Sequence, residues 1–139
     1  MSHSYKDLIV WQKAVSMVTE VYRATRSFPR EETYGLTSQL RRSAVSVASN
    51  IAEGQGRISK PEFRQFLGMA RGSSVEMETQ IVIAGSLGYI SHEIADRLAA
   101  KSGEVSRLLH GLMQSLQPRV VLEPGTRNRK PETLSSLRC

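Results

Sequence analysis

Apolar residues recur at helical spacing along most of the first 117 residues of the chain. Between residues 34 and 53 one such row consists of Leu36, Leu40, Ala44, Val47 and Ile51. Their separations of three or four residues are typical of a helix stripe that faces a core. Similar rows occur three more times, so the pattern predicts an all-α protein with four long helices.

The first and third rows are expected to be core-facing seams. In the first helix the row is Leu8, Trp11, Val15, Val18, Tyr22 and Thr25. In the third helix it is Phe63, Leu67, Ala70, Ser74, Met77, Ile81, Ala84 and Gly88. The third row keeps its alternation of four and three over more than three heptads, which favours near-parallel helix packing as in a four-helix bundle.

Local signals set the expected boundaries of the helices. The first helix runs from near Asp7 to Ser27, because Phe28-Pro29 ends it. The second runs from about residue 32 or 34 to 53, where Gly54 and Gly56 favour a left-handed helix end. A capping box beginning at Ser59 starts the third helix. The fourth starts at Ser91 and stops before Pro118.

The short connections between these helices predict an antiparallel, up-down-up-down four-helix bundle over residues 1–117. Residues 118–139 have three prolines, scattered charges and no periodicity, and they read as a flexible basic tail. Two interpretations of this tail stay open: a chain end without a function, or a binding arm.

A polar stripe accompanies the apolar row of the second helix. It consists of Gln39, Arg42, Ser46, Asn50 and Glu53, again at steps of three and four. These amide, hydroxyl, guanidinium and carboxylate groups can satisfy one another if a neighbour covers them. We expect a buried or interfacial polar network, which the third-helix carboxylates Glu76 and Glu78 join.

The third helix has more apolar surface than a single bundle needs. Residues 81–84 read Ile-Val-Ile-Ala and put apolar groups on every side of one turn. The same helix contains Gly68, Gly72 and Gly85, and each glycine is unfavourable by roughly 0.5–1 kcal/mol relative to alanine. Both features favour contact with a second subunit, although packing within the chain remains an alternative.

The net charge is +6, and it permits binding to a polyanion. Residues 1–117 hold 14 Lys and Arg against 11 Asp and Glu, while residues 118–139 hold 5 against 2. The candidate nucleic-acid contacts are Arg23, Arg26, Arg30, Arg41, Arg57, Lys60, Arg64 and Arg71. Alternatively, Arg42 and Arg71 pair with Glu53, Glu76 or Glu78.

Other chemistry has little support in the sequence. The one cysteine, Cys139, cannot form a disulfide within the chain, and no apolar run reaches the roughly 20 residues of a membrane-spanning helix. We therefore expect a cytoplasmic protein without a membrane partner. His92 and Asp96 lack the other ligands of a zinc site, and no motif marks a nucleophile. We expect no metal, no cofactor and no enzymatic activity.

Several motifs together resemble the 23S rRNA intervening-sequence proteins, also called S23 ribosomal proteins. They are Leu8-x-x-Trp11-x-x-Ala14, Phe28-Pro29, Tyr34-Gly35-Leu36-Thr37-x-Gln39-x-Arg41-Arg42 and Ser49-Asn50-Ile51-Ala52-Glu53-Gly54. The third helix adds Phe66-Leu67-x-x-Ala70-x-Gly72-Ser73 and Glu76-x-Glu78. The resemblance covers about residues 5–117, and the arginine pair followed by NIAEG is its most distinctive part.

This resemblance implies a bacterial, non-catalytic four-helix bundle that forms a homopentameric ring. A related branch of accessory proteins serves the reverse transcriptase of diversity-generating retroelements, where it engages the enzyme and nucleic acid. The expected function is therefore weak, electrostatic binding of RNA or DNA by an oligomer. The alternative is a protein-docking scaffold or an accessory subunit for a nucleic-acid enzyme such as a reverse transcriptase.

Overall fold

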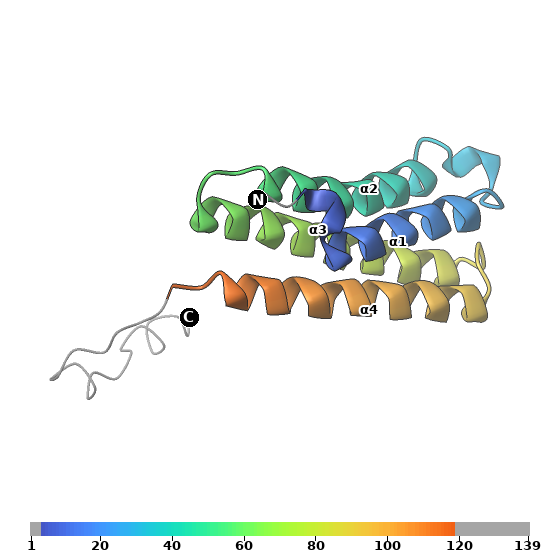
Figure 1. The fold of residues 1–139 in the computed structure, drawn as a ribbon. Helices are drawn as coiled ribbons and strands as arrows, with labels where there is room; N and C mark the ends of the chain where they lie inside the picture. Colours follow the sequence, from blue (N-terminus) through green and yellow to red (C-terminus); the bar gives the residue numbers. More distant parts are fainter. Residues whose placement is uncertain (1–3, 119–139) are drawn as a thin grey trace, which may run out of the picture.

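Four antiparallel helices form an up-down-up-down bundle in the computed structural model, which describes residues 4–118 (Figure 1). The helices are α1 (Ile9–Thr25), α2 (Leu36–Gln55), α3 (Lys60–Ser86) and α4 (His92–Ser115). Two short 3-10 helices, η1 (Tyr5–Asp7) and η2 (Arg30–Glu32), precede α1 and α2. Residues 4–118 contain no strand, which confirms the predicted all-α class. The predicted tail lies outside the described residues from position 119 onward.

The helices follow one another around the bundle, so that the backbone of each comes close to the two beside it and not to the one diagonally opposite. The α2–α3 contact is the most extensive of the four. Gly54 explains part of this closeness: a Cβ at this position would lie 2.8 Å from Phe66 Cβ and 2.9 Å from Phe63 Cδ1. The glycine therefore lets α2 approach the start of α3.

The predicted starts of α3 and α4 are confirmed by their caps. The Ser59 hydroxyl accepts a hydrogen bond from the Glu62 amide (3.3 Å), and the Ser91 hydroxyl accepts one from the Ile94 amide (3.2 Å). Each bond satisfies an amide that has no partner inside the helix. Gly88, with φ +75°, ends α3, and the Tyr89 amide donates back to the Ala84 carbonyl.

Two predicted boundaries shift for local reasons. The helix α2 begins at Leu36 because the Glu32 carboxylate reaches the Leu36 amide (3.4 Å) and the preceding residues form η2. At its other end α2 continues to Gln55. The expected left-handed glycine is wrong there, since Gly56 has φ −78° and Gly54 lies inside the helix.

The predicted core rows are confirmed for α2 and for the middle of α3, where the fully buried side chains include Leu40, Ile51, Leu67, Met77 and Ile81. The row predicted for α1 is wrong by one position, except at Thr25, which is buried as predicted. Its core residues are Val10, Ala14, Met17, Val21 and Thr25. Both rows have helical spacing, and the predicted row lies instead along the boundary between α1 and α2. None of the described helices is long and apolar enough to cross a membrane.

Candidate nucleic-acid and protein interface

The middle of the polar stripe forms a hydrogen-bonded cluster between α2 and α3. Asn50 Nδ2 donates to the carbonyl oxygen (2.9 Å) and the hydroxyl oxygen (3.0 Å) of Ser46. Ser73 Oγ on α3 donates to Ser46 Oγ (3.0 Å). Ser46 and Asn50 are half-buried, so this part of the stripe lies at a helix boundary, as a partly covered polar network would.

The ends of the stripe behave differently. Glu53 pairs with Arg57 (2.9 Å), one turn later on the same helix. Gln39 and Arg42 are exposed and make no side-chain hydrogen bond or ion pair with another residue of the described range 4–118. One chain therefore does not join the five residues into one network, and their role at an interface stays a prediction.

The two carboxylates expected to join the stripe lie on different sides of α3. Glu76 accepts a long hydrogen bond from Gln80 Nε2 (3.4 Å), and Gln80 Oε1 accepts one from Ser43 Oγ of α2 (2.6 Å). Glu78 accepts instead from Ser102 Oγ of α4 (2.8 Å). A separation of two residues turns the side chain by about 200° around a helix, which explains the division.

The sequence analysis missed a buried layer of hydroxyl groups between α3 and α4. Ser74 Oγ lies 3.1 Å from Ser102 Oγ and 3.2 Å from Ser106 Oγ, and Ser74 and Ser102 are completely buried. The apolar rows contain a signal for this layer, because Ser74 and Ser102 each occupy a core-facing position between apolar residues of their helices. Two polar residues in facing rows can satisfy each other.

Three of the eight candidate nucleic-acid contacts are engaged within the chain. Arg41 Nε donates to Thr25 Oγ1 (2.8 Å), and its guanidinium lies over the Tyr22 ring. Arg57 pairs with Glu53 and covers the Phe66 ring. Arg64 Nε donates to the Met113 carbonyl (3.2 Å). These contacts give the three arginines structural roles.

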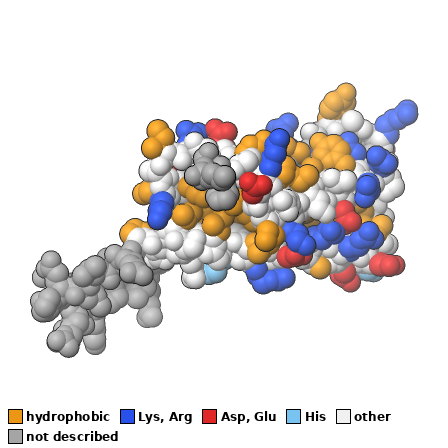
Figure 2. Space-filling model, viewed as in Figure 1, with side chains coloured by type: hydrophobic (Ala, Val, Ile, Leu, Met, Phe, Trp, Pro, Cys, Tyr) orange, Lys and Arg blue, Asp and Glu red, His pale blue; other side chains and the backbone are white. Residues whose placement is uncertain are grey.

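The other five candidate cations are free of side-chain partners within residues 4–118: Arg23, Arg26, Arg30, Lys60 and Arg71. The first three surround the end of α1, where Lys and Arg side chains gather at the right-hand end of Figure 2. Lys60 starts α3 at the opposite end, and Arg71 lies midway along α3. The structure therefore spreads these five cations over both ends and the middle of the bundle. The group at the end of α1 also has an acidic neighbour, Glu31, beside Arg30.

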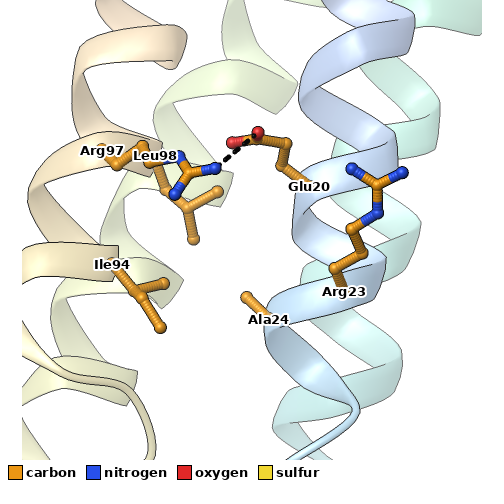
Figure 3. Close-up of a pocket in the computed structure, with 6 residues that line it drawn as sticks. All are labelled: Glu20, Arg23, Ala24, Ile94, Arg97 and Leu98. Carbon is orange, nitrogen blue, oxygen red and sulfur yellow. Dashed lines mark hydrogen bonds and ion pairs between the residues drawn. The ribbon is translucent and has the colours of Figure 1, made fainter.

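A small cleft lies between α1 and α4 next to this basic end, with a volume of about 170 Å³. Figure 3 shows its apolar wall, formed by Ala24, Ile94 and Leu98. Arg97 Nη2 lies 3.3 Å and Lys101 Nζ 3.9 Å from the same oxygen, Glu20 Oε1. Figure 3 shows the Arg23 guanidinium on the side of α1 that is turned away from α4, so Arg23 does not point into the cleft.

A wider groove of about 520 Å³ separates α3 from α4. Its lining combines apolar Val82 with Glu78, His92 and Asp96. Within residues 4–118, no group of three or more His, Cys, Asp or Glu side chains is arranged to hold a metal ion.

In the connection between α3 and α4, the Tyr89 hydroxyl donates a hydrogen bond to Glu32 Oε2 (3.0 Å). This bond ties the connection to η2. This hydrogen bond, with smaller contributions from burial and the Glu32 and Glu31 charges, raises the pKa of Tyr89.

Comparison with known proteins agrees with this architecture. The chain is similar to a crystallised protein of unknown function from the S23 ribosomal protein family of Bacteroides thetaiotaomicron, with a TM-score of 0.69 and 21% sequence identity. The similarity covers 76% of this chain and 99% of the other, and at this identity it shows a shared fold. No curated protein matches the chain. The sequence pattern of the 23S rRNA-intervening sequence proteins matches residues 6–111. The chain therefore belongs to the 23S rRNA-intervening sequence protein family.

Proposed function

We propose that this protein is a non-catalytic oligomer that binds RNA or DNA through electrostatic contacts with the phosphate backbone. The observation that carries the proposal is the group formed by Arg23, Arg26 and Arg30. All three side chains are exposed at one end of the bundle and have no side-chain partner among residues 4–118. Each subunit of an oligomer contributes such a group, and affinity for phosphate rises with the number of cations engaged.

The binding is independent of base sequence in this proposal. The sequence of residues 4–118 contains no recognised DNA- or RNA-binding motif, and the half-buried aromatic side chains Phe63 and Phe66 lie against α2 beside Gly54. Contacts to phosphate position a protein but carry no base information. The proposed function follows from the positive charge of each subunit and from its repetition in an oligomer. The proposed oligomer is the homopentameric ring that the family resemblance implies.

Salt dependence of binding to a structured RNA and to a DNA duplex tests this function. Replacing Arg23, Arg26 and Arg30 together by Gln should lower the slope of log affinity against log salt by about 2–3, because each phosphate contact contributes about 0.7–0.9. The matched control replaces Lys13, Arg97 and Lys101, which are ion-paired on the α1–α4 boundary, and changes the net charge equally.

An equal loss in the control would show that net charge alone matters, and the proposed site at the end of α1 would be wrong. Absence of binding to either nucleic acid at low salt would contradict the function as a whole. Deleting residues 118–139 tests the contribution of the tail, which carries a further +3.

A second candidate is a docking protein for a larger enzyme, such as the reverse transcriptase served by the accessory proteins that this family resembles. The exposed apolar residues Val75, Val82 and Ile83 of α3 favour contact with protein. Recovery of one specific protein partner, without any nucleic-acid binding by the purified chain, would favour this candidate.

A further inference from the structure

The outer side of α3 carries an uncharged row of small and apolar residues. The row consists of Gly68, Gly72, Val75, Thr79, Val82 and Ser86, and we call it the α3 ridge. Its spacing of four and three residues is the seam spacing of helices that pack against each other. Val75 and Val82 are 54% and 67% exposed, so residues 4–118 leave this part of the ridge uncovered.

Gly72 is the least explained member of the ridge within one chain. A Cβ added to Gly72 would meet no atom within 4 Å outside its own helix turn. Glycine in the interior of a helix is less favourable than alanine by about 0.8–1.0 kcal/mol. Nothing in the described part of the chain requires a residue without a side chain here, whereas a second helix approaching closely would.

A second, largely apolar surface lies over the boundary between α1 and α2, with Arg41 as its one charged member. Arg41 covers the Tyr22 ring, with 4.5 Å between Cζ and the ring centroid, and this contact places one row of each helix along the boundary. The row of α1 is Trp11, Val15, Val18 and Tyr22, and the row of α2 is Arg41, Val45, Ala48 and Ala52. We call these two rows the α1–α2 strip. Val15 and Val45 are 37% and 39% exposed, and Figure 2 shows hydrophobic side chains over these two helices.

The charges beside the two surfaces allow a complementary contact. Arg64 and Arg71 flank the α3 ridge on the side of α4, together with Glu78, and Glu76 flanks it on the other side as its exposed carboxylate. Arg42 and Arg26 flank the α1–α2 strip; both are exposed and free of partners within residues 4–118. The border of the ridge therefore carries both signs, and its Glu76 carboxylate can pair with the free cations beside the strip. By contrast, the α1–α4 boundary carries ion pairs across its surface and offers no uncharged row.

We propose that the α3 ridge of one copy docks on the α1–α2 strip of a second copy, with Val75 and Val82 between α1 and α2. This inference rests on the proposed self-association and names the surfaces that produce it. Because the two surfaces differ, each contact leaves one free ridge and one free strip. Such heterologous contacts add further copies until a ring closes or a filament forms.

Mixing two variants tests the proposal. The ridge variant carries Val75→Arg and Val82→Arg, and the strip variant carries Val15→Arg and Val45→Arg. Each variant alone should be monomeric at micromolar concentration, with its dissociation constant raised at least about 30-fold, because an unpaired charge enters an apolar contact. An equimolar mixture should form a heterodimer and nothing larger, because only one intact ridge and one intact strip remain to pair.

All four substituted positions are exposed, so circular dichroism should show unchanged helix content in both variants. The control is Ile94→Arg, a half-exposed apolar position on the α1–α4 boundary, which should leave the assembly unchanged. Folded variants that keep the wild-type assembly, or that fail to pair when mixed, would overturn the assigned surfaces. A wild-type protein that is monomeric at micromolar concentration would overturn self-association itself.

Discussion

The α2–α3 and α1–α4 boundaries join antiparallel helices of one bundle by different chemistry. Between α2 and α3, Gly54 permits close approach and buried polar groups make short bonds, such as Ser43 to Gln80 at 2.6 Å. Between α1 and α4, long side chains form exposed ion pairs, such as Lys13 to Glu104 at 3.1 Å. The polar contacts of the first boundary are buried or half-buried, whereas Lys13 and Glu104 on the second are each about half exposed.

This difference indicates where the bundle is held together and where it is open to partners. Removing one partner of a buried hydrogen bond leaves the other partner unsatisfied and lowers the free energy of unfolding by about 1–3 kcal/mol. An exposed ion pair typically contributes only about 0.2–1 kcal/mol. The uncharged α3 ridge lies on the helix that shares the tight boundary. The uncharged outer row of α3 is suited to contact with another protein, whereas the charged side chains of the α1–α4 boundary favour contact with water.

Gly54→Ala should break the α2–α3 boundary most strongly. The added methyl would overlap Phe66 Cβ and Phe63 Cδ1, and overpacking of a core typically reduces the free energy of unfolding by about 1–3 kcal/mol. The control Gly85→Ala has ordinary contact distance, 3.8 Å to Ala95 Cβ, and should gain about 0.5–1 kcal/mol. Urea unfolding of both variants measures the contrast, and equal effects would show that the close approach is unimportant.

Ser43→Ala should have the next largest effect, a loss of about 1–2 kcal/mol, because it leaves the buried Gln80 amide without its hydroxyl partner. The double variant Ser43→Ala with Gln80→Met replaces both polar groups and should recover most of the loss. A double-mutant cycle measures this coupling. Additive losses would mean that the hydrogen bond does not link the two helices energetically.

Lys13→Met should change stability by less than about 0.5 kcal/mol, because it removes an ion pair in which both side chains are about half exposed. Added salt should reduce even this difference, since exposed pairs are screened. Thermal unfolding at low and high salt measures the effect. A loss as large as that of Ser43→Ala would contradict the contrast between the two boundaries.

The smallest effect concerns the connection at the end of the bundle. Because Glu32 raises the pKa of Tyr89 above the ordinary value of 10.0, the bond stabilises the fold below that pH and is lost as the pH rises through the folded pKa. Wild-type stability should therefore decline at alkaline pH more than that of Tyr89→Phe. Identical alkaline profiles would show that the bond does not contribute.

The sequence predicted the helices and their starts because caps and apolar spacing are local properties. Ser59 and Ser91 identified two helix starts directly. The row chosen for α1 was wrong, since spacing alone cannot say which of two adjacent apolar rows faces the core. Val15 and Val18 belong to the row along α2, while Ala14 and Met17 face the interior.

The candidate site was predictable only in part for the same reason. Alignment along a helix identified Ser46 and Asn50 as neighbours, but the partner across the boundary, Ser73, depends on how α3 packs. The basic residues were visible in the sequence. Which of them are engaged depends on nonlocal contacts, such as Arg64 with the Met113 carbonyl.

Sedimentation equilibrium of the wild-type protein over a range of salt concentrations tests the central claim most directly. If the uncharged α3 ridge and α1–α2 strip join the copies, the protein should be larger than a monomer at micromolar concentration. The assembly should persist at high salt, because apolar burial is not screened, while only the contribution of flanking charges such as Glu76 and Arg42 weakens. A monomer at all salt concentrations, or an assembly that dissociates as salt rises, would contradict the account.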